Sequence, residues 1–310
     1  MIYTCTLNPA IDLFVELENF QPYVVNRSIT EDYQANGKAI NISFILKKMG
    51  IGNTAMGFLG GFTGQFIEEV LQKKGIHTDF VRIEGTTRIN TFVRSRDKEY
   101  KIVNRGPNIT RIEEILMIKK INQLTAGDIL FVSGSLPRGV SDDILIEISR
   151  IAREKQLRLI LDVSSTKLLD CLAYRPYLIK PNEEELSAMF GKRLLTREEV
   201  IEAAHQLMER GVQNILVSLG EKGALFVNKD KVIMTTAPKG KVVNTACAGD
   251  SMLAAFVGSI LLEKSIEESL AFSTAVGSST AFSMGLSNLL DVPELVKQVQ
   301  LQELEYKGGN

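Results

Sequence analysis

The sequence predicts an α/β fold with a mostly parallel central sheet and a second, smaller sheet. From about residue 125 onward, short apolar segments alternate with amphipathic ones. Strands that alternate with helices in this way form parallel sheets that are covered on both faces. In the first third of the chain, polar and apolar residues partly alternate instead, as they do in half-exposed strands. These two observations distinguish a large α/β body from a small strand-rich part.

Four segments of the alternating region have the length and apolar content of buried strands: 129–134, 158–165, 177–180 and 214–220. Amphipathic helices are predicted over 142–156 and 196–211. In the second, Thr196 and Glu199 have the spacing of a capping box, and Gly211 marks the end. Ligands of open α/β sheets bind at the carboxyl ends of the strands, so we expect polar motifs that follow these strands to share one cleft.

The first third contains two strand-like segments, 12–20 and 87–104, and a turn is expected at Asp97–Lys98 in the second. Two helices are predicted between these segments, over roughly 38–49 and 64–74, and each is followed by a glycine. The strand-like segments therefore leave the main body at separate points in the chain.

No low-complexity linker or internal repeat divides the 310 residues. We therefore interpret the two strand-like segments as one small lid over the cleft. The expected organisation is a single domain over 1–310, with a lid formed by approximately 12–35 and 86–105.

The composition is typical of a globular protein of the cytoplasm. The formal net charge of −1 gives no support for a nucleic-acid or membrane-surface partner. The N-terminus lacks the charged start of a signal peptide, and the longest apolar run is too short to span a bilayer. Three cysteines without a CxxC pair argue against disulfides and zinc sites. The two histidines lie in structural settings, so chemistry is left to Asp, Glu, Lys, Arg and backbone amides.

The stretch NTACAGDS at 244–251 is the first candidate for chemistry. Small residues surround Asp250, and the apolar run that follows predicts a buried helix. The first amides of a helix have no internal partners and its dipole is positive there, so this end can bind phosphate. Asp250 could accept a proton from an attacking hydroxyl. A plain helix cap by Asp250 or Ser251 explains the motif equally well.

Two further motifs have both a structural and a functional interpretation. In KPNEEEL at 180–186, Asn182 and Glu185 have capping-box spacing, while Glu185 could also stand near a hydrated Mg²⁺. In QANGKAINIS at 34–43, Lys38 could meet a phosphate or could simply be solvated at the start of a helix. Each motif alone favours the structural interpretation.

Two glycine-containing turns follow predicted strands. VSGSLPRG at 132–139 could line a substrate site or make an ordinary connection, and SLGEKGAL at 218–225 fits a hairpin or a loop beside a nucleotide. The chain has no GxxxxGK[ST], which excludes a P-loop nucleotidase. It has no GxGxxG after the first strand, which leaves little support for an NAD site.

Taken in order, TLNPAID, ANGKAIN, GSLPRG, KPNEEEL, SLGEKG and NTACAGDS resemble the ribokinase-like sugar kinases of the phosphofructokinase B family. The resemblance covers nearly the whole chain, and TLNPAID and GSLPRG are most similar to bacterial 1-phosphofructokinases. It implies a ribokinase-like three-layer sandwich with a mostly parallel sheet and a small β-sheet lid, which often serves dimerisation. It also implies ATP and Mg²⁺.

By matching position, the resemblance implies that Asp250 is the catalytic base. The implied anion hole consists of Cys247, Ala248 and Gly249. The implied substrate-binding residues are Asp12, Gly37, Lys38, Asn41, Arg27, Arg88, Asn90 and Ser135. Of these, Arg27, Arg88 and Asn90 are the candidates for the substrate's own phosphate, reached from the lid. The implied nucleotide-binding residues are Lys180, Asn182, Ser218, Gly220 and Gly223, and Glu185 would reach Mg²⁺ through water.

Two motifs depart from the family pattern, because the usual GAGD is CAGD here and the usual GGKG is NGKA. We treat Asn36 as a mild change, since Asn tolerates positive φ. A side chain at positive φ would cost about 1–2 kcal/mol, so we expect Cys247 to have negative φ and a donating amide. Thiols at helix N-termini can have a lowered pKa. We therefore also expect oxidation or alkylation of Cys247 to inactivate the protein, and ATP to protect it.

The leading hypothesis is an ATP-dependent kinase that phosphorylates a hydroxyl of a phosphorylated ketohexose, converting fructose 1-phosphate to fructose 1,6-bisphosphate. Two alternatives stay open. One is a tagatose 6-phosphate kinase or another sugar or nucleoside kinase, and the other is a non-catalytic sugar-phosphate-binding homologue. The expected partners are a sugar phosphate, ATP and a second copy bound through the lid, in the cytoplasm.

Overall fold

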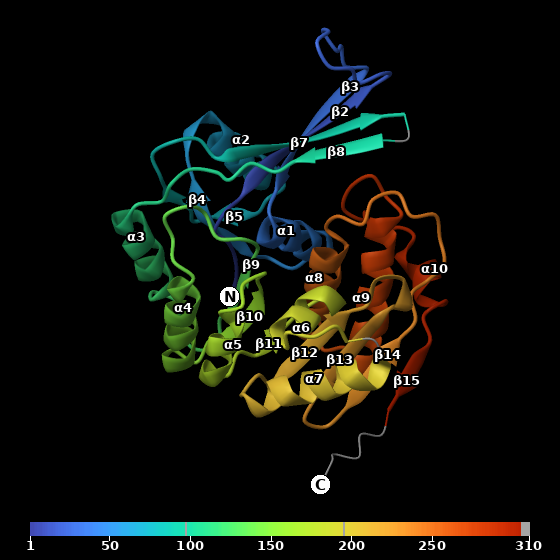
Figure 1. Cartoon of the computed structure of the whole chain (residues 1–310). Helices are drawn as coiled ribbons and strands as arrows, with labels where there is room; N and C mark the ends of the chain where they lie inside the picture. The colour runs from blue at the N-terminus through green and yellow to red at the C-terminus, as the bar shows by residue number, and fades with distance from the viewer. Residues whose placement is uncertain (97, 195, 305–310) are drawn as a thin grey trace.

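The computed structural model describes residues 1–96, 98–194 and 196–304, and a large, mostly parallel sheet forms its centre (Figure 1). Its strands in spatial order are β15 (Leu301–Glu303), β14 (Val232–Thr235), β13 (Ala224–Asn228), β12 (Asn214–Ser218), β11 (Leu178–Ile179), β10 (Arg158–Asp162), β9 (Ile129–Ser133), β1 (Ile2–Thr6), β4 (Thr54–Leu59) and β5 (His77–Thr78), and β6 (Val81–Arg82) also pairs with β4. Neighbours from β12 to β5 are parallel, whereas β13, β14 and β15 are added antiparallel. The predicted mostly parallel sheet is therefore confirmed.

Helices cover both faces of this sheet. One face packs against α1 (Lys38–Lys48), α8 (Ala248–Leu261), α9 (Ile266–Ala281) and α10 (Val292–Val296). The other face packs against α3 (Arg111–Ile121), α4 (Asp143–Glu154), α5 (Leu168–Cys171), α6 (Glu183–Met189) and α7 (Arg197–Glu209). Short 3₁₀ turns, η1 (Leu172–Tyr174) and η2 (Gly220–Lys222), complete the connections. The result is a helix–sheet–helix sandwich, as the sequence predicted.

The strand β9 shows why its residues form a doubly buried strand. Leu130 and Val132 pack into the core beneath α3 and α4, while Ile129 and Phe131 pack into the core beneath α1 and α8. Successive side chains of a strand point to opposite faces, so only a continuous apolar run can satisfy both helical layers.

A second sheet stands apart from the sandwich and above it in Figure 1. Its order is β3 (Thr30–Asn36), β2 (Ala10–Leu17), β7 (Arg88–Ser95) and β8 (Lys98–Ile102), with β2 and β7 parallel. It is joined to the body by a separate core in which Ile11 and Ala35 pack with α1 and with α2 (Gly61–Lys73). Of the expected turn at 97–98, Lys98 opens β8, and Asp97 lies outside the described residues.

Local predictions were accurate at the helix starts that carry caps. The side chains of Thr196 and Asn182 each accept a hydrogen bond from the backbone of the Glu three residues on, which completes two capping boxes. The helix predicted over 64–74 begins earlier, at Gly61, because Gly60 and Gly61 form its uncapped start. None of the helices in the described ranges has the length and apolar content needed to cross a bilayer.

The turn after β12 is the connection of an antiparallel hairpin, so the hairpin interpretation of SLGEKGAL is correct. Gly223 has φ +106, and a Cβ built on it would lie 2.0 Å from the carbonyl oxygen of Thr235 in β14. Gly223 is therefore needed for strand packing, whatever its relation to a nucleotide. A Cβ on Gly220 would meet no atom within 4 Å, so Gly220 borders open space.

Candidate active site

The predicted base lies where α8 meets the carboxyl ends of the central strands. Asp250 is in the first turn of α8, with only 6% of its surface exposed. Lys38 at the start of α1, Asp162 at the end of β10 and Lys180 after β11 all interact electrostatically with its carboxylate. The crossing of one helix terminus with several strand ends thus concentrates charge at one point.

Cys247 precedes this helix with φ 64, so the expectation of negative φ was wrong. This left-handed turn directly precedes the first amides of α8. The Ser251 amide donates to the Cys247 carbonyl at 2.9 Å, so the helix is properly started. The Ala248 amide lies 3.4 Å from the Thr245 carbonyl, which is a long hydrogen bond.

The protonation of Asp250 is set by competing neighbours. Burial raises its pKa most, and the charge of Asp162 raises it further, whereas Lys38, Asn41 and Lys180 lower it, which leaves a pKa of about 6. A carboxylate with this pKa is ionised at neutral pH and is a stronger proton acceptor than an exposed one, as general-base catalysis requires.

Two lysines flank the buried carboxylate of Asp162. The Nζ atoms of Lys38 and Lys180 lie 3.1 Å and 3.4 Å from its Oδ1. A Cβ built on Gly249 would lie 3.1 Å from the Lys180 Nζ, so that ammonium stands beside the first amides of α8. Burial tends to lower the pKa of Lys38, but Asp162, Asp250 and Glu185 raise it above its ordinary value. The ammonium groups of two lysines and the first amides of α8 therefore converge on one place that suits a phosphate.

Glu185 lies at the edge of this cluster, in the first turn of α6. Its carboxylate accepts hydrogen bonds from the Asn182 amide at 3.0 Å and the Ser164 hydroxyl at 2.7 Å, and it lies 4.0 Å from the Lys38 Nζ. Asp162 Oδ2 is buried and has no hydrogen-bond partner in the described part of the chain. Hard oxygen ligands near a phosphate site fit Mg²⁺, which is usually held by one or two carboxylates together with waters and substrate phosphates.

A cavity of about 550 Å³ opens between the small sheet, α1 and the start of α8. Asp12, Asn41 and Cys247 are in its wall, so three of the predicted site residues share one space. Phe14 and Phe92 from the small sheet stack at 5.0 Å between ring centroids and line the same cavity. A polar base with an apolar roof suits a sugar, which has hydroxyl edges and apolar faces.

Asp12 is held by two side-chain amides of the small sheet. Its Oδ1 accepts from Asn90 Nδ2 at 2.8 Å, and its Oδ2 accepts from Asn36 Nδ2. Burial raises the pKa of Asp12, while the hydrogen bonds from Asn90 and Asn36 and the charge of Arg88 oppose that rise. The structure therefore pairs Asn90, predicted for the substrate's phosphate, with Asp12, predicted for the sugar hydroxyls.

The cations expected for the substrate's own phosphate are placed differently from the prediction. Arg88 donates to the carbonyls of Asn8 at 2.8 Å and Asn104 at 3.0 Å, and Arg27 is exposed in the loop between β2 and β3. Neither lines the cavity that holds Asp12. Four lysines that sequence reasoning did not single out do line it: Lys47, Lys48, Lys74 and Lys101. They come from the ends of α1, of α2 and from β8, which only the tertiary structure brings together.

The remaining predicted residues lie around the same cleft. Gly37 caps α1 at φ 147, and a Cβ there would come within 2.6 Å of Thr6 Cγ2. Ser135 lies after β9 and is 3.4 Å from Asn8 Nδ2. Ser218 ends β12 and pairs with Asn182 through an isolated bridge, which places the Gly220 turn next to the start of α6.

Sequence reasoning missed two polar residues. Asp162 could have been found, because a carboxylate that ends a buried parallel strand lies at the ligand edge of the sheet. Asn36 was considered only for its backbone, yet it ends β3 and is absent from the described non-glycine residues with positive φ. Its side chain is what matters, since it bonds both Asp12 and Asn41.

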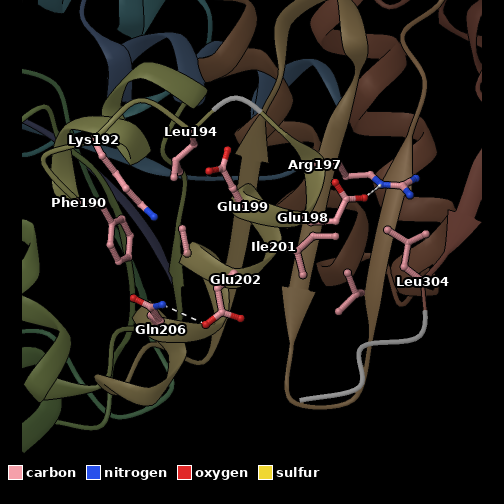
Figure 2. Close-up of a pocket in the computed structure, with 12 residues that line it drawn as sticks. Phe190, Lys192, Leu194, Arg197, Glu198, Glu199, Ile201, Glu202, Gln206 and Leu304 are labelled. Atoms are coloured by element: carbon pink, nitrogen blue, oxygen red, sulfur yellow. Dashed lines mark hydrogen bonds and ion pairs between the residues drawn. The ribbon is translucent and has the colours of Figure 1, made fainter. Parts of the chain in front are cut away.

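A second cavity of about 560 Å³ lies elsewhere, between α6, α7, β14 and the end of β15 (Figure 2). Its polar lining residues pair locally. Gln206 donates to Glu202 at 3.0 Å, and Arg197 to Glu198 at 3.3 Å. None of the predicted site residues is among the described residues that line it, so this second cavity is separate from the predicted site.

The thiol of Cys247 is expected to be unreactive. Burial raises its pKa well above the ordinary value, and the charges of Asp250 and Asp12 raise it further, so the earlier expectation of a lowered pKa was wrong. At pH 8, iodoacetamide should label Cys247 more slowly than it labels free cysteine, because the thiolate is the reacting form.

Asp250→Asn should speed labelling of Cys247 in the folded protein, since it removes one of the two negative neighbours. Mass spectrometry of the labelled peptide separates Cys247 from the fully buried Cys5 and Cys171. Labelling faster than that of free cysteine would contradict the raised pKa.

Comparisons with known proteins agree with this geometry. The sequence pattern of the pfkB family carbohydrate kinases matches residues 6–293. The chain is 53% identical to a D-tagatose-1-phosphate kinase of Bacillus licheniformis over 98% of this chain and 100% of that one, and 35% identical to a 1-phosphofructokinase of Bacillus subtilis with the same coverages. The crystal structure of a putative phosphofructokinase from Staphylococcus aureus superposes with a TM-score of 0.89 at 34% identity, covering 99% of this chain and 100% of that one. Both of these Bacillus relatives are named as kinases of phosphorylated sugars. The chain therefore belongs to the pfkB family of carbohydrate kinases.

Proposed function

We propose that this protein transfers the γ-phosphoryl group of ATP to a hydroxyl of a ketohexose 1-phosphate and forms a bisphosphate. The observation that carries the proposal is the buried carboxylate of Asp250, which lies at the N-terminus of α8 beside Lys38 and Lys180. D-tagatose 1-phosphate is the first candidate and D-fructose 1-phosphate the second, because the relative named for the former is 53% identical and the one named for the latter 35%. Tagatose 6-phosphate has less support.

The charge of the cavity favours a substrate that already carries phosphate. Four lysines line its wall, Lys47, Lys48, Lys74 and Lys101, whereas the carboxylates that line it are Asp12 and Glu99. We propose that Asp12 and Asn41 hold sugar hydroxyls at one end, and that these lysines attract the substrate phosphate from the lid side.

In the proposed mechanism, Asp250 takes the proton from the attacking hydroxyl, and the hydroxyl oxygen bonds directly to the γ-phosphorus as the bond to ADP breaks. The amides of 247–249, with Lys38 and Lys180, stabilise the charge on the transferred group. Bound Mg²⁺ would supply neutralisation of the nucleotide phosphates, and Glu185 and Asp162 would hold its waters. Asn182, Ser218, Gly220 and Gly223 would border the nucleotide.

We also propose a cytoplasmic location and a lid-mediated homodimer. The three cysteines are free, as is usual in a reducing compartment. Apolar side chains are exposed on and beside the small sheet, including Val25 at 82%, Ile29 at 62% and Val103 at 62%. Apolar groups gathered on one small sheet are typical of a surface that a partner covers.

A coupled ADP-release assay across a sugar panel tests the function. The panel contains the 1-phosphates and 6-phosphates of tagatose and fructose, together with the free sugars. The 1-phosphates should give the highest kcat/KM, and the free sugars should fail because they lack an anion for the lysines. Binding of sugar phosphate without any ADP release would instead support the non-catalytic alternative.

Asp250→Asn should lower kcat by about 10²–10⁴, the usual contribution of a general base, while nucleotide binding by calorimetry stays intact. In the wild type, kcat/KM should fall as the pH drops through about 6, because protonated Asp250 cannot accept a proton. Near-normal turnover in the variant would refute the assigned base.

Val25→Asp combined with Ile29→Asp should convert a dimer to a monomer in analytical ultracentrifugation, because two charges on each lid would be buried without partners. Ile112→Asp is the matched control, since Ile112 is 73% exposed. It belongs to α3, a helix that lies away from the small sheet (Figure 1). A wild-type monomer at micromolar concentration would rule out the proposed dimer.

A further inference from the structure

A continuous chain of hydrogen bonds joins the two carboxylates of the site. Asn36 Nδ2 donates to Asp12 Oδ2, Asn41 Nδ2 donates to Asn36 Oδ1 at 2.9 Å, and the same Asn41 nitrogen donates to Asp250 Oδ2 at 2.9 Å. Asn36 is thus the only described residue that bonds both Asp12 and Asn41.

The direction of each bond in this chain is fixed by chemistry. Ionised carboxylates only accept hydrogen bonds, so the amide nitrogens of Asn36 and Asn41 must face Asp12 and Asp250 respectively. Asn36 Oδ1 then accepts the hydrogen bond from Asn41 Nδ2, and the Gly37 backbone amide also donates to this oxygen at 2.5 Å. An amide is needed at position 36, because it must donate at one end and accept at the other.

The chain crosses from one structural unit to the other. Asp12 and Asn36 belong to β2 and β3 of the small sheet, whereas Asn41 and Asp250 belong to α1 and α8 of the sandwich. Asp12, Asn36 and Asn41 all line the cavity of about 550 Å³. A sugar that binds Asp12 therefore perturbs a carboxylate that is three hydrogen bonds from the base.

We propose that Asn36 is a positioning residue that couples the sugar-binding carboxylate on the lid to the orientation of the catalytic base. The proposal rests on the proposed function of the site. It assigns Asn36 no contact with the transferred phosphoryl group, since its effect on Asp250 passes through Asn41.

The physical reason lies in the two hydrogens of the Asn41 amide. They are offered to three acceptors: Asn36 Oδ1, Asp250 Oδ2 and Cys247 Sγ, the last at 3.1 Å. Sulfur is the weak acceptor of the three. With Asn36 present, one hydrogen is fixed on its oxygen and the other on Asp250. Without Asn36, only the thiol remains as an alternative, so the amide is less firmly oriented and the donor to Asp250 is weakened.

Loss of that donor should raise the pKa of Asp250, because a hydrogen bond to the ionised form lowers it. The other groups that act on this carboxylate are Asp162 on β10, Lys38 on α1 and Lys180 after β11, while the neutral Cys247 thiol lies at the start of α8. Asn36→Ala removes none of these three charges. It does remove the Asn36 contact with the thiol, which raises the pKa of Cys247 and leaves the thiol neutral, so a shift in the pH profile would report the Asn41 hydrogen bond.

Asn90→Ala is the matched control. Asn90 bonds the other oxygen of Asp12 from β7 and does not bond Asn41. Both variants remove one amide from Asp12, so both should raise KM for the sugar phosphate several-fold. Only Asn36→Ala should also move the acid limb of the kcat profile upward from about pH 6 by about one pH unit, which lowers kcat by about twofold at pH 7 and by about tenfold at pH 5. KM for ATP should stay unchanged in both.

The pH profiles of ADP release for the wild type and the two variants decide the matter. An acid limb that coincides in the wild type and Asn36→Ala, or that moves equally in Asn90→Ala, would overturn the coupling while leaving the proposed function intact. A wild type that releases no ADP with any sugar phosphate would overturn both. Asn36→Gly, which also suits the end of a strand, replaces Asn36→Ala if thermal unfolding shows that the alanine variant is unfolded, and the same outcomes apply.

Discussion

The site depends on keeping one carboxylate, Asp250, ionised although it is almost fully buried. An unpaired buried charge would cost several kcal/mol, and a second carboxylate, Asp162, lies close enough to add to that cost. Lys38 and Lys180 balance the pair, and Asn41 adds a hydrogen bond to Asp250. Removing either lysine would therefore affect more than phosphate binding, because the base itself would become neutral at a higher pH.

The same balance explains why the fold brings these elements together. Lys38 opens α1, Lys180 follows β11, Asp162 ends β10 and Asp250 opens α8, so each charge stands at the terminus of a different element. At such termini the backbone is not paired within its own element and can face a ligand. The apolar faces of these elements pack into two large cores. This packing fixes the positions of the polar ends relative to one another.

The sequence was sufficient for the parts of this arrangement that are local. The parallel strands and the capping boxes at Asn182 and Thr196 depend on residues close together in the chain, and they were predicted correctly. The left-handed backbone of Cys247 and the cavity position of Lys101 could not be predicted in this way. A cysteine at position 247 gives no local signal for a φ that glycine normally favours. The position of Lys101 is decided by contacts between segments far apart in the sequence. The side-chain role of Asn36 was hidden for the same reason, since it bonds Asp12 across a strand pair.

The backbone, charge and hydrogen bonding of the site explain why a thiol is tolerated at position 247. Its left-handed backbone costs about 1–2 kcal/mol compared with glycine, and it lies directly before the first amides of α8. A thiol that remains protonated adds no charge beside Asp250 and Asp12, whereas an Asp or Glu there would place a third carboxylate next to these two. The Cys247 sulfur also lies within 3.1 Å of the Asn41 amide, as a weak acceptor that does not compete strongly with the base. A small, neutral, weakly accepting side chain is therefore compatible with a site whose function depends on where the hydrogens of Asn41 point.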